Sequence, residues 1–168
     1  TSKNIDILIN NAGTLFNALF QMTSEKKLKE IFQVNYFSQI YLTQIISRGM
    51  AKNKNGNIIF VSSTSGIAGD AGRFAYSSTK ASIINTVRTL SKELSNYNIR
   101  VNAVSPGLTK TDLMTSNTKK DIINSEVQKI SLKRVANTNE IANVILFLAS
   151  DRSSYINGQN IIADGGYL

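Results

Sequence analysis

Short apolar runs alternate with longer amphipathic stretches along the chain. Runs rich in isoleucine and valine predict strands at 5–10, 56–63, 99–107 and 160–166. Apolar residues spaced three and four apart predict helices over about 24–52, about 74–96 and 137–150. Continuous apolar strands separated by helices are typical of a parallel sheet that is covered on both faces. The pattern therefore predicts a single α/β domain over residues 1–168, built on a doubly wound parallel sheet.

Polar residues and glycines gather where three of the predicted strands end. They lie at 10–13, at 62–63 and at 106–107. Ligands bind at the carboxyl ends of the strands in sheets of this type, so these clusters indicate a binding site. The segment 108–135 is polar and irregular, and we expect it to form short helices in a mobile insertion.

The helix predicted at 74–96 carries two polar residues on its apolar face. That face consists of Tyr76, Lys80, Ile83, Ile84, Val87, Leu90 and Leu94. Tyr76 and Lys80 stand at its N-terminal end, near the end of the preceding strand. Burying an ammonium without a partner costs on the order of several kcal/mol, so a polar site is expected beside them.

The helix predicted at 24–52 repeats this arrangement. Its apolar stripe consists of Leu28, Ile31, Phe32, Leu42, Ile45 and Ile46, and Asn35 falls on the same face. Off that stripe lie Val34, Phe37, Ile40 and Tyr41, which we expect to be available to a partner. Each of these polar residues can also be explained by structure alone. Tyr76 would be a core tyrosine with a hydrogen-bonded hydroxyl, Lys80 would extend its ammonium to solvent, and Asn35 would hydrogen-bond the end of a strand. Their convergence on one region favours a functional site.

The chemistry of a phenol next to an ammonium explains this choice of residues. A free tyrosine has a pKa of about 10 and is a poor acid or base at neutral pH. A cation within about 4–6 Å favours the phenolate, and Lys80, one helical turn after Tyr76, is expected to lower its pKa in this way. Ser63, at the end of the second strand, is the candidate to hold a carbonyl oxygen beside the phenol.

Composition excludes several classes of site. The 168 residues include no cysteine and no histidine, which rules out disulfides, thiol chemistry, zinc sites built on these residues and a Ser-His-Asp triad within this chain. We expect no metal. The net charge is +8, but basic residues occur singly or in pairs, which favours solvated helix faces over a nucleic-acid surface. No apolar run approaches about 18 residues and no secretory signal is visible, so we expect a cytoplasmic protein without membrane contact.

Five motifs occur in order: "NNAG" at 10–13, "VNYFS" at 34–38, "VSS" at 61–63, "YSSTK" at 76–80 and "SPG" at 105–107. Together with the ending "NEIANVILFLASDRSSYINGQNIIADGG", they resemble the short-chain dehydrogenase/reductase family over essentially the whole chain. Within it, "IANVILFLASD" and "INGQ" look most like the 3-oxoacyl-[acyl-carrier-protein] reductases. The resemblance implies a Rossmann-like fold and an NAD(P)-dependent oxidoreductase that interconverts a carbonyl and a secondary alcohol.

The resemblance also implies residue roles. Tyr76 would be the catalytic acid–base, Ser63 would hydrogen-bond the substrate oxygen, and Lys80 would also hold the nicotinamide ribose hydroxyls. Asn35 would anchor a water of a proton relay. NAD or NADP, which the sequence does not distinguish, would be bound by Tyr76, Lys80 and the loop residues Asn10, Ala12, Gly13, Pro106, Gly107, Thr109 and Thr111. The segment 108–135 would be the substrate loop.

One part of the family pattern is not found. No glycine-rich strand-to-helix turn of the G-x-x-x-G-x-G type occurs, so we expect this chain to be the C-terminal portion of such a domain, lacking roughly 80 residues. The outer edge of the strand at 5–10 is then expected to be unpaired. The expected substrate is a small carbonyl or alcohol compound, which the resemblance to 3-oxoacyl-[acyl-carrier-protein] reductases implies is linked to acyl carrier protein. Further copies of the chain are expected as partners in a homo-oligomer. The alternative is a catalytically inactive truncated homologue that acts as an assembly partner.

Two further function classes and two turns complete the predictions. Ser77-x-x-Lys80 matches one motif of penicillin-binding serine enzymes, but the accompanying S-D-N and K-T-G are absent. Nucleic-acid binding would depend on charge alone. Loop conformations are predicted for Gly66, Gly69 and Gly72, and a turn is predicted at 164–166.

Overall fold

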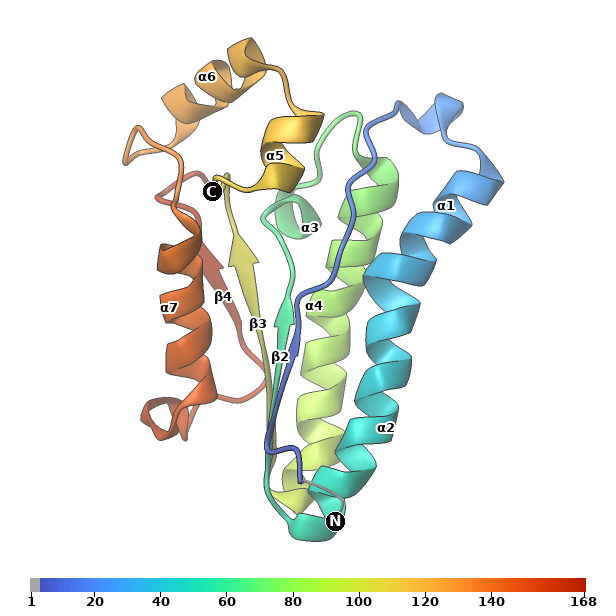
Figure 1. Ribbon diagram of the computed structural model, residues 1–168, viewed down its shortest axis with the longest axis vertical. Coiled ribbons are helices and arrows are strands. Elements are labelled where there is room, and N and C mark those ends of the chain that lie inside the picture. Colours follow the sequence, from blue (N-terminus) through green and yellow to red (C-terminus); the bar gives the residue numbers. More distant parts are fainter. Residues whose placement is uncertain (1–3) are drawn as a thin grey trace.

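The computed structural model describes residues 4–168 and contains a four-stranded parallel sheet. The strands are β1 (Ile7–Asn10), β2 (Gly56–Val61), β3 (Ile99–Pro106) and β4 (Asn160–Ala163). They lie in the order β1-β2-β3-β4, and each pairs in parallel with its neighbour in the chain. This sheet, with helices on both faces, confirms the predicted doubly wound, Rossmann-like α/β class (Figure 1).

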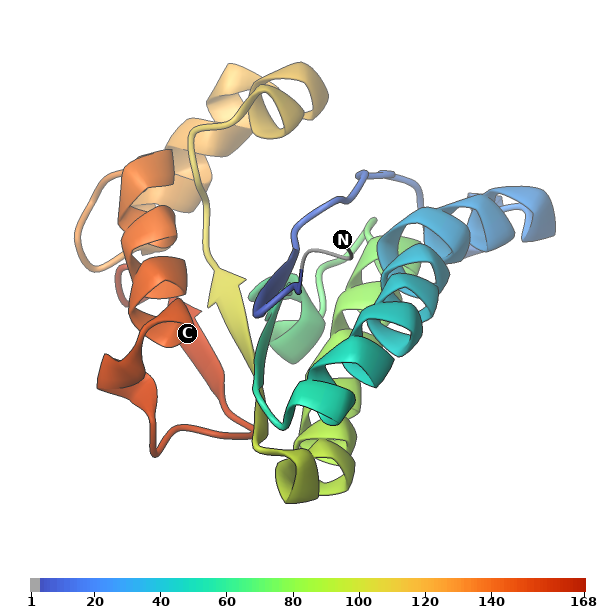
Figure 2. The same ribbon diagram turned by 60° about the horizontal axis from the view of Figure 1, so that its bottom comes forward.

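Helices cover the two faces of the sheet unequally. One face packs against the π-helical turn η2 (Gln33–Phe37), α2 (Ser38–Asn53) and α4 (Phe74–Leu94), and α1 (Glu25–Phe32) packs against α4. The other face packs against α7 (Thr138–Ala149), and Figure 2 shows α7 opposite to α2 and α4. The shorter helices are η1 (Phe20–Met22), α3 (Ser65–Ala68), η3 (Ser95–Tyr97), α5 (Asp112–Asn117), α6 (Lys120–Lys129) and η4 (Asp151–Ser153).

Alternate residues of the central strands serve two cores. On β2, Ile58 and Phe60 belong to the cluster under α4, whereas Ile59 belongs to the cluster under α7. All three are fully buried. A strand buried on both faces has no polar alternation, which is why these strands read as continuous apolar runs.

The predicted helix starts are confirmed, and the segment 108–135 contains short helices as expected. The Ser24 hydroxyl accepts a 3.2 Å hydrogen bond from the Lys27 amide, and Asn137 and Glu140 form the predicted capping box. Short helices, α5 and α6, occupy most of 108–135.

The register predicted for the first long helix is wrong in part beyond Asn35, although Ile46 packs against the core as predicted. Leu42 and Ile45, predicted to be buried, are 45% and 64% exposed, while Gln39 and Thr43 are buried instead. The π-helical turn η2 inserts an extra residue into the helix, which rotates every later side chain by about one residue position. For the same reason Ile40 packs against the core, although it was predicted to lie off the stripe.

One of the predicted loop glycines is helical. Gly66 lies in α3, where an ideal Cβ would stand 2.7 Å from the carbonyl carbon of Lys80, so only glycine lets α3 pack this closely on α4. Gly69 and Gly72 have the predicted loop conformation. Their φ values, +72° and +78°, lie in the left-handed region that glycine adopts without strain. The turn predicted at 164–166 is confirmed, since the Asp164 carboxylate accepts hydrogen bonds from Gly166 N and Leu168 N.

The outer strand β1 is exposed along one side. Within residues 4–168 it pairs with β2 alone, and Ile5, Ile7 and Ile9 are each 46% exposed. No helix in this part of the chain is both long enough and apolar enough to cross a bilayer.

Candidate active site

The carboxyl ends of the strands and the N-terminal end of α4 meet at one end of the molecule. β2 ends at Val61 and continues into Ser62 and Ser63, while Tyr76 and Lys80 lie in the first two turns of α4. The α3–α4 pair packs closely here, and Ser62 Oγ donates a 2.9 Å hydrogen bond to Lys80 O. Because Ser62 is buried in this contact, Ser63 is the serine free to face a substrate.

Ser63 and Tyr76 are hydrogen-bonded to each other. The Ser63 Oγ accepts a 3.2 Å hydrogen bond from Ser65 N, which leaves its own O–H to be donated. A hydrogen bond from Ser63 to the phenol oxygen lowers the pKa of Tyr76. The two groups predicted to hold a substrate oxygen are therefore brought together.

The Lys80 ammonium is buried beside this pair. Its side chain is 4% exposed, and its Nζ donates a 2.7 Å hydrogen bond to Val61 O. It stands 5.7 Å from the centre of the Tyr76 ring. Burial lowers the pKa of Lys80 from 10.5 to about 8, because a desolvated ammonium is disfavoured relative to the neutral amine.

The expectation that Lys80 lowers the pKa of Tyr76 is wrong for this structure. Burial of the phenol raises the pKa of Tyr76, and the Ser63 hydrogen bond and the positive charge of Arg73 oppose that rise. Lys80 is not among the groups that shift the pKa of Tyr76. Arg73, three residues before Tyr76, was missed although this spacing would have indicated it.

Asn35 fastens the loop that follows β1. It lies fully buried in the π-helical turn, donates to Thr14 O at 2.8 Å and to Thr79 Oγ1 at 3.3 Å, and accepts from Thr14 N at 2.7 Å. Its side chain thus connects the loop to α4. Its predicted role as the anchor of a relay water stays a prediction.

The other residues of that loop are held by α2. Asn10 is buried and donates to Thr43 Oγ1 at 2.9 Å, and Ala12 O accepts a 2.6 Å hydrogen bond from Gln39 Nε2. Gln39 was not predicted, because the π-helical turn decides that it faces the loop. Gly13 lies against the site: an ideal Cβ there would stand 3.7 Å from Lys80 Nζ and 3.6 Å from Asn35 Oδ1.

The residues predicted at the end of β3 begin the 108–135 segment. Gly107 packs against Asp164, where an ideal Cβ would stand 2.7 Å from the Asp164 Cβ. Thr109 Oγ1 donates to Gly107 O at 3.0 Å, and Thr111 caps α5 by accepting from Met114 N at 3.2 Å. Pro106 ends β3. Their predicted contacts with the cofactor stay predictions.

The residues present fit the ribose end of a nicotinamide cofactor. A lysine ammonium has three N–H donors, and within the described residues Lys80 has one hydrogen-bond acceptor, Val61 O. Such a buried ammonium needs further acceptors, which vicinal hydroxyls provide. Gly13 leaves the side facing Lys80 Nζ without a side chain.

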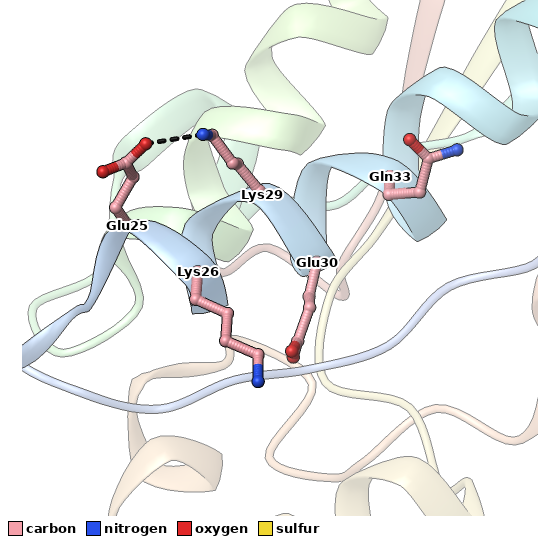
Figure 3. Close-up of a pocket in the computed structure, with 5 residues that line it drawn as sticks. All are labelled: Glu25, Lys26, Lys29, Glu30 and Gln33. Carbon is pink, nitrogen blue, oxygen red and sulfur yellow. Dashed lines mark ion pairs between the residues drawn. The ribbon is translucent and has the colours of Figure 1, made fainter.

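A hollow elsewhere on the surface does not resemble a reaction centre. It has a volume of about 560 Å³ and is lined by residues of the α1 surface: Glu25, Lys26, Lys29, Glu30 and Gln33 (Figure 3). Its charges balance, and Lys29 pairs with Glu25 at 2.5 Å. Over residues 4–168 no group of three or more histidine, cysteine or acidic residues is placed to hold a metal ion.

Comparison with known proteins assigns the family. The family model described as Enoyl-(Acyl carrier protein) reductase matches residues 1–168, and the chain belongs to the short-chain dehydrogenase/reductase family. It is 42% identical over 164 residues to the 3-oxoacyl-[acyl-carrier-protein] reductase of Thermotoga maritima, covering 98% of this chain and 66% of that protein. The Aquifex aeolicus reductase of the same name is 41% identical, with 96% and 65% covered.

Solved structures agree with this assignment. A 3-oxoacyl-[acyl-carrier protein] reductase from Brucella melitensis superposes with a TM-score of 0.94 at 27% identity, covering 99% of this chain and 64% of that one. A 4-hydroxyisoleucine dehydrogenase complexed with NADH superposes with a TM-score of 0.92 at 30% identity, covering 98% and 68%. The chain thus spans about two thirds of the length of the curated relatives that it matches.

Proposed function

We propose that this site carries out the proton transfer of an NAD(P)-dependent oxidoreductase that interconverts a carbonyl and a secondary alcohol. The observation that carries the proposal is the placement of Tyr76 beside the buried Lys80 at the end of β2, with Ser63 acting on the phenol. Two aligned hydroxyls there suit one substrate oxygen, which needs a proton donor and an orienting hydrogen bond.

Each side chain has a distinct task in this proposal. Tyr76, whose raised pKa keeps it protonated at neutral pH, gives its proton to the carbonyl oxygen during reduction. Ser63 donates a second hydrogen bond to that oxygen and fixes its position. Lys80 holds the ribose hydroxyls of the nicotinamide cofactor, NAD or NADP, which when bound supplies or accepts the hydride. With a pKa of about 8, Lys80 is also suited to return a proton to the phenolate.

The substrate that we propose is a 3-oxoacyl group carried on acyl carrier protein. The identities of 42% and 41% to two reductases of that name support this choice. The net charge of +8 is favourable for association with an acidic carrier protein. We also propose a homo-oligomer, supported by the exposed apolar side chains Val34, Phe37 and Tyr41 on the outer side of η2 and α2. The alternative of an inactive assembly partner has no support from the relatives.

The test is reduction of acetoacetyl-acyl-carrier-protein, followed by loss of NADH or NADPH absorbance, in the protein that carries this sequence. Tyr76→Phe should lower kcat/KM by about 10²–10⁴-fold while far-ultraviolet circular dichroism stays unchanged. Tyr155→Phe is the matched control, because Tyr155 is fully exposed. Full turnover by Tyr76→Phe would contradict the assigned role, and no turnover by the wild type with either cofactor would favour the inactive alternative.

A further inference from the structure

The helix α6, in the predicted substrate loop, is joined to the segment that follows β4 by a side-chain hydrogen bond. None of its ten residues is fully buried, and its apolar residues Ile123 and Val127 are only half-buried. The Tyr167 hydroxyl, however, donates a 2.8 Å hydrogen bond to Glu126 Oε2 in the middle of α6. The other carboxylate oxygen, Oε1, accepts from Lys129 at 2.6 Å. Tyr167 is thus the side chain that connects α6 to the segment following β4.

Main-chain contacts fix the segment that follows α6. Gly166 O accepts from Ser131 N at 3.2 Å and from Ser131 Oγ at 2.8 Å, and Gly165 O accepts from Leu132 N at 3.0 Å. Both glycines have φ values, +68° and +80°, that disfavour other residues. This turn therefore holds residues 131–132 without help from Tyr167, and the Tyr167–Glu126 hydrogen bond acts on α6 itself.

The helix α6 and the candidate active site both interact electrostatically with the turn that leads into α4. Arg73 lowers the pKa of both Glu126 in α6 and Tyr76 in α4, and Asp70 acts electrostatically on Tyr167 and Tyr76. Charges of the turn that leads into α4 therefore act both on α6 and Tyr167 and on the phenol of Tyr76. Figure 1 shows α6 at the end of the molecule to which the strands point, beyond the end of β3.

We propose that Tyr167 is a positioning residue, whose hydrogen bond to Glu126 holds α6 as one wall of the substrate entrance. The inference rests on the proposed function for its substrate, a 3-oxoacyl chain that passes between α6 and the turn before α4. A hydroxyl that donates to a carboxylate makes a charge-assisted bond, which is stronger than a neutral one. Losing it raises the population of conformations with α6 detached by about tenfold. Substrate binding is then weaker, whereas the proton transfer at Tyr76 stays intact.

The first test is limited trypsin digestion, which needs no activity. Cleavage sites in and around α6 are Lys119, Lys120, Lys129, Lys133 and Arg134. Tyr167→Phe should raise the cleavage rate at these sites about tenfold and leave cleavage at Lys52 and Lys92 unchanged. Tyr155→Phe should leave all rates unchanged. Glu126→Gln, which keeps an acceptor for the Tyr167 hydroxyl, should give a smaller increase than Tyr167→Phe. Equal rates for Tyr167→Phe and the wild type would overturn the inference.

The second test is kinetic and links α6 to the substrate. Tyr167→Phe should raise KM for the 3-oxoacyl substrate about tenfold, with kcat and the cofactor KM within twofold of the wild type. A fall in kcat without a change in KM would overturn the positioning role. If the wild type itself has no turnover, the proposed function fails, and the trypsin result still decides whether Tyr167 fastens α6.

Discussion

Lys80 Nζ stands 5.7 Å from the centre of the Tyr76 ring and donates its hydrogen bond to Val61 O. The residue that supplies positive charge to the buried phenol is instead Arg73, at the start of the same helix. Lys80 and Arg73 therefore have different roles beside Tyr76. Lys80 is a buried amine with a pKa of about 8, and Arg73 supplies a positive charge that favours the phenolate of Tyr76.

Burial of Lys80 makes stability depend on pH. Its pKa is about 8 when folded, whereas an unfolded lysine has a pKa near 10.5, so between these values the unfolded chain binds a proton that the folded chain has released. The contribution of Lys80 therefore favours folding increasingly as pH rises from 8 to 10.5, by up to about 3 kcal/mol. Below pH 8 the full cost of burying the ammonium is present.

Urea unfolding of the wild type and Lys80→Met at pH 7.5, 8.5 and 9.5 measures this contribution. The free energy of unfolding of Lys80→Met relative to the wild type should be highest at pH 7.5 and fall as pH rises. Lys92→Met, on the same helix, is the control and should give a difference that does not change with pH. Parallel curves for Lys80→Met and the wild type would show that Lys80 is not desolvated.

The ionisation of Tyr76 is accessible to ultraviolet titration. The difference in phenolate absorbance between the wild type and Tyr76→Phe isolates this one residue among the six tyrosines. Because burial raises its pKa above 10, the step should lie above pH 10. Arg73→Gln should move the step to higher pH, because it removes a charge that favours the phenolate, whereas Arg88→Gln should not move it. A step below pH 10 would contradict the assigned burial.

Two helical glycines offer opposite outcomes for the same substitution. Gly66→Ala places a Cβ 2.7 Å from the Lys80 carbonyl carbon, so α3 must move away from α4. It should lower the free energy of unfolding by about 1–3 kcal/mol. Gly49, in α2, has nothing within 4 Å of its Cβ position, and Gly49→Ala should raise that free energy by about 0.5–1 kcal/mol. Thermal unfolding of both variants tests this, and a stable Gly66→Ala would mean that α3 does not pack as described.

Local signals were sufficient for most elements of the fold. Continuous apolar runs predicted all four strands, and Ser24 and Asn137 predicted two helix starts, because strand burial and helix capping depend on neighbouring residues. The π-helical turn was not predictable in this way. It exposes Leu42 and buries Gln39, against the order of their hydrophobicity, and it contains Asn35, whose side chain hydrogen-bonds the loop after β1.

The candidate site was predictable in its members but not in its electrostatics. Spacing placed Ser63 and Tyr76 at the ends of strand and helix, where the structure joins them. Spacing also suggested that Lys80 acts on the phenol. Whether Lys80 can act on the phenol depends on the burial of both groups, which is a property of the tertiary structure. Burial lowers the pKa of Lys80 and raises that of Tyr76. The Tyr167–Glu126 contact joins residues 41 apart and had no sequence signal.

The hydrogen bonds of Asn35 should make it one of the most sensitive polar positions in the chain. Asn35→Ala leaves the Thr14 N–H and C=O without their partner and should lower the free energy of unfolding by about 2–4 kcal/mol. Asn85→Ala, at an exposed position of α4, is the control and should change it by less than about 0.5 kcal/mol. Urea unfolding measures both. Equal midpoints for the two variants would mean that the π-helical turn is held by the helices around it and that Asn35 does not stabilise the loop after β1.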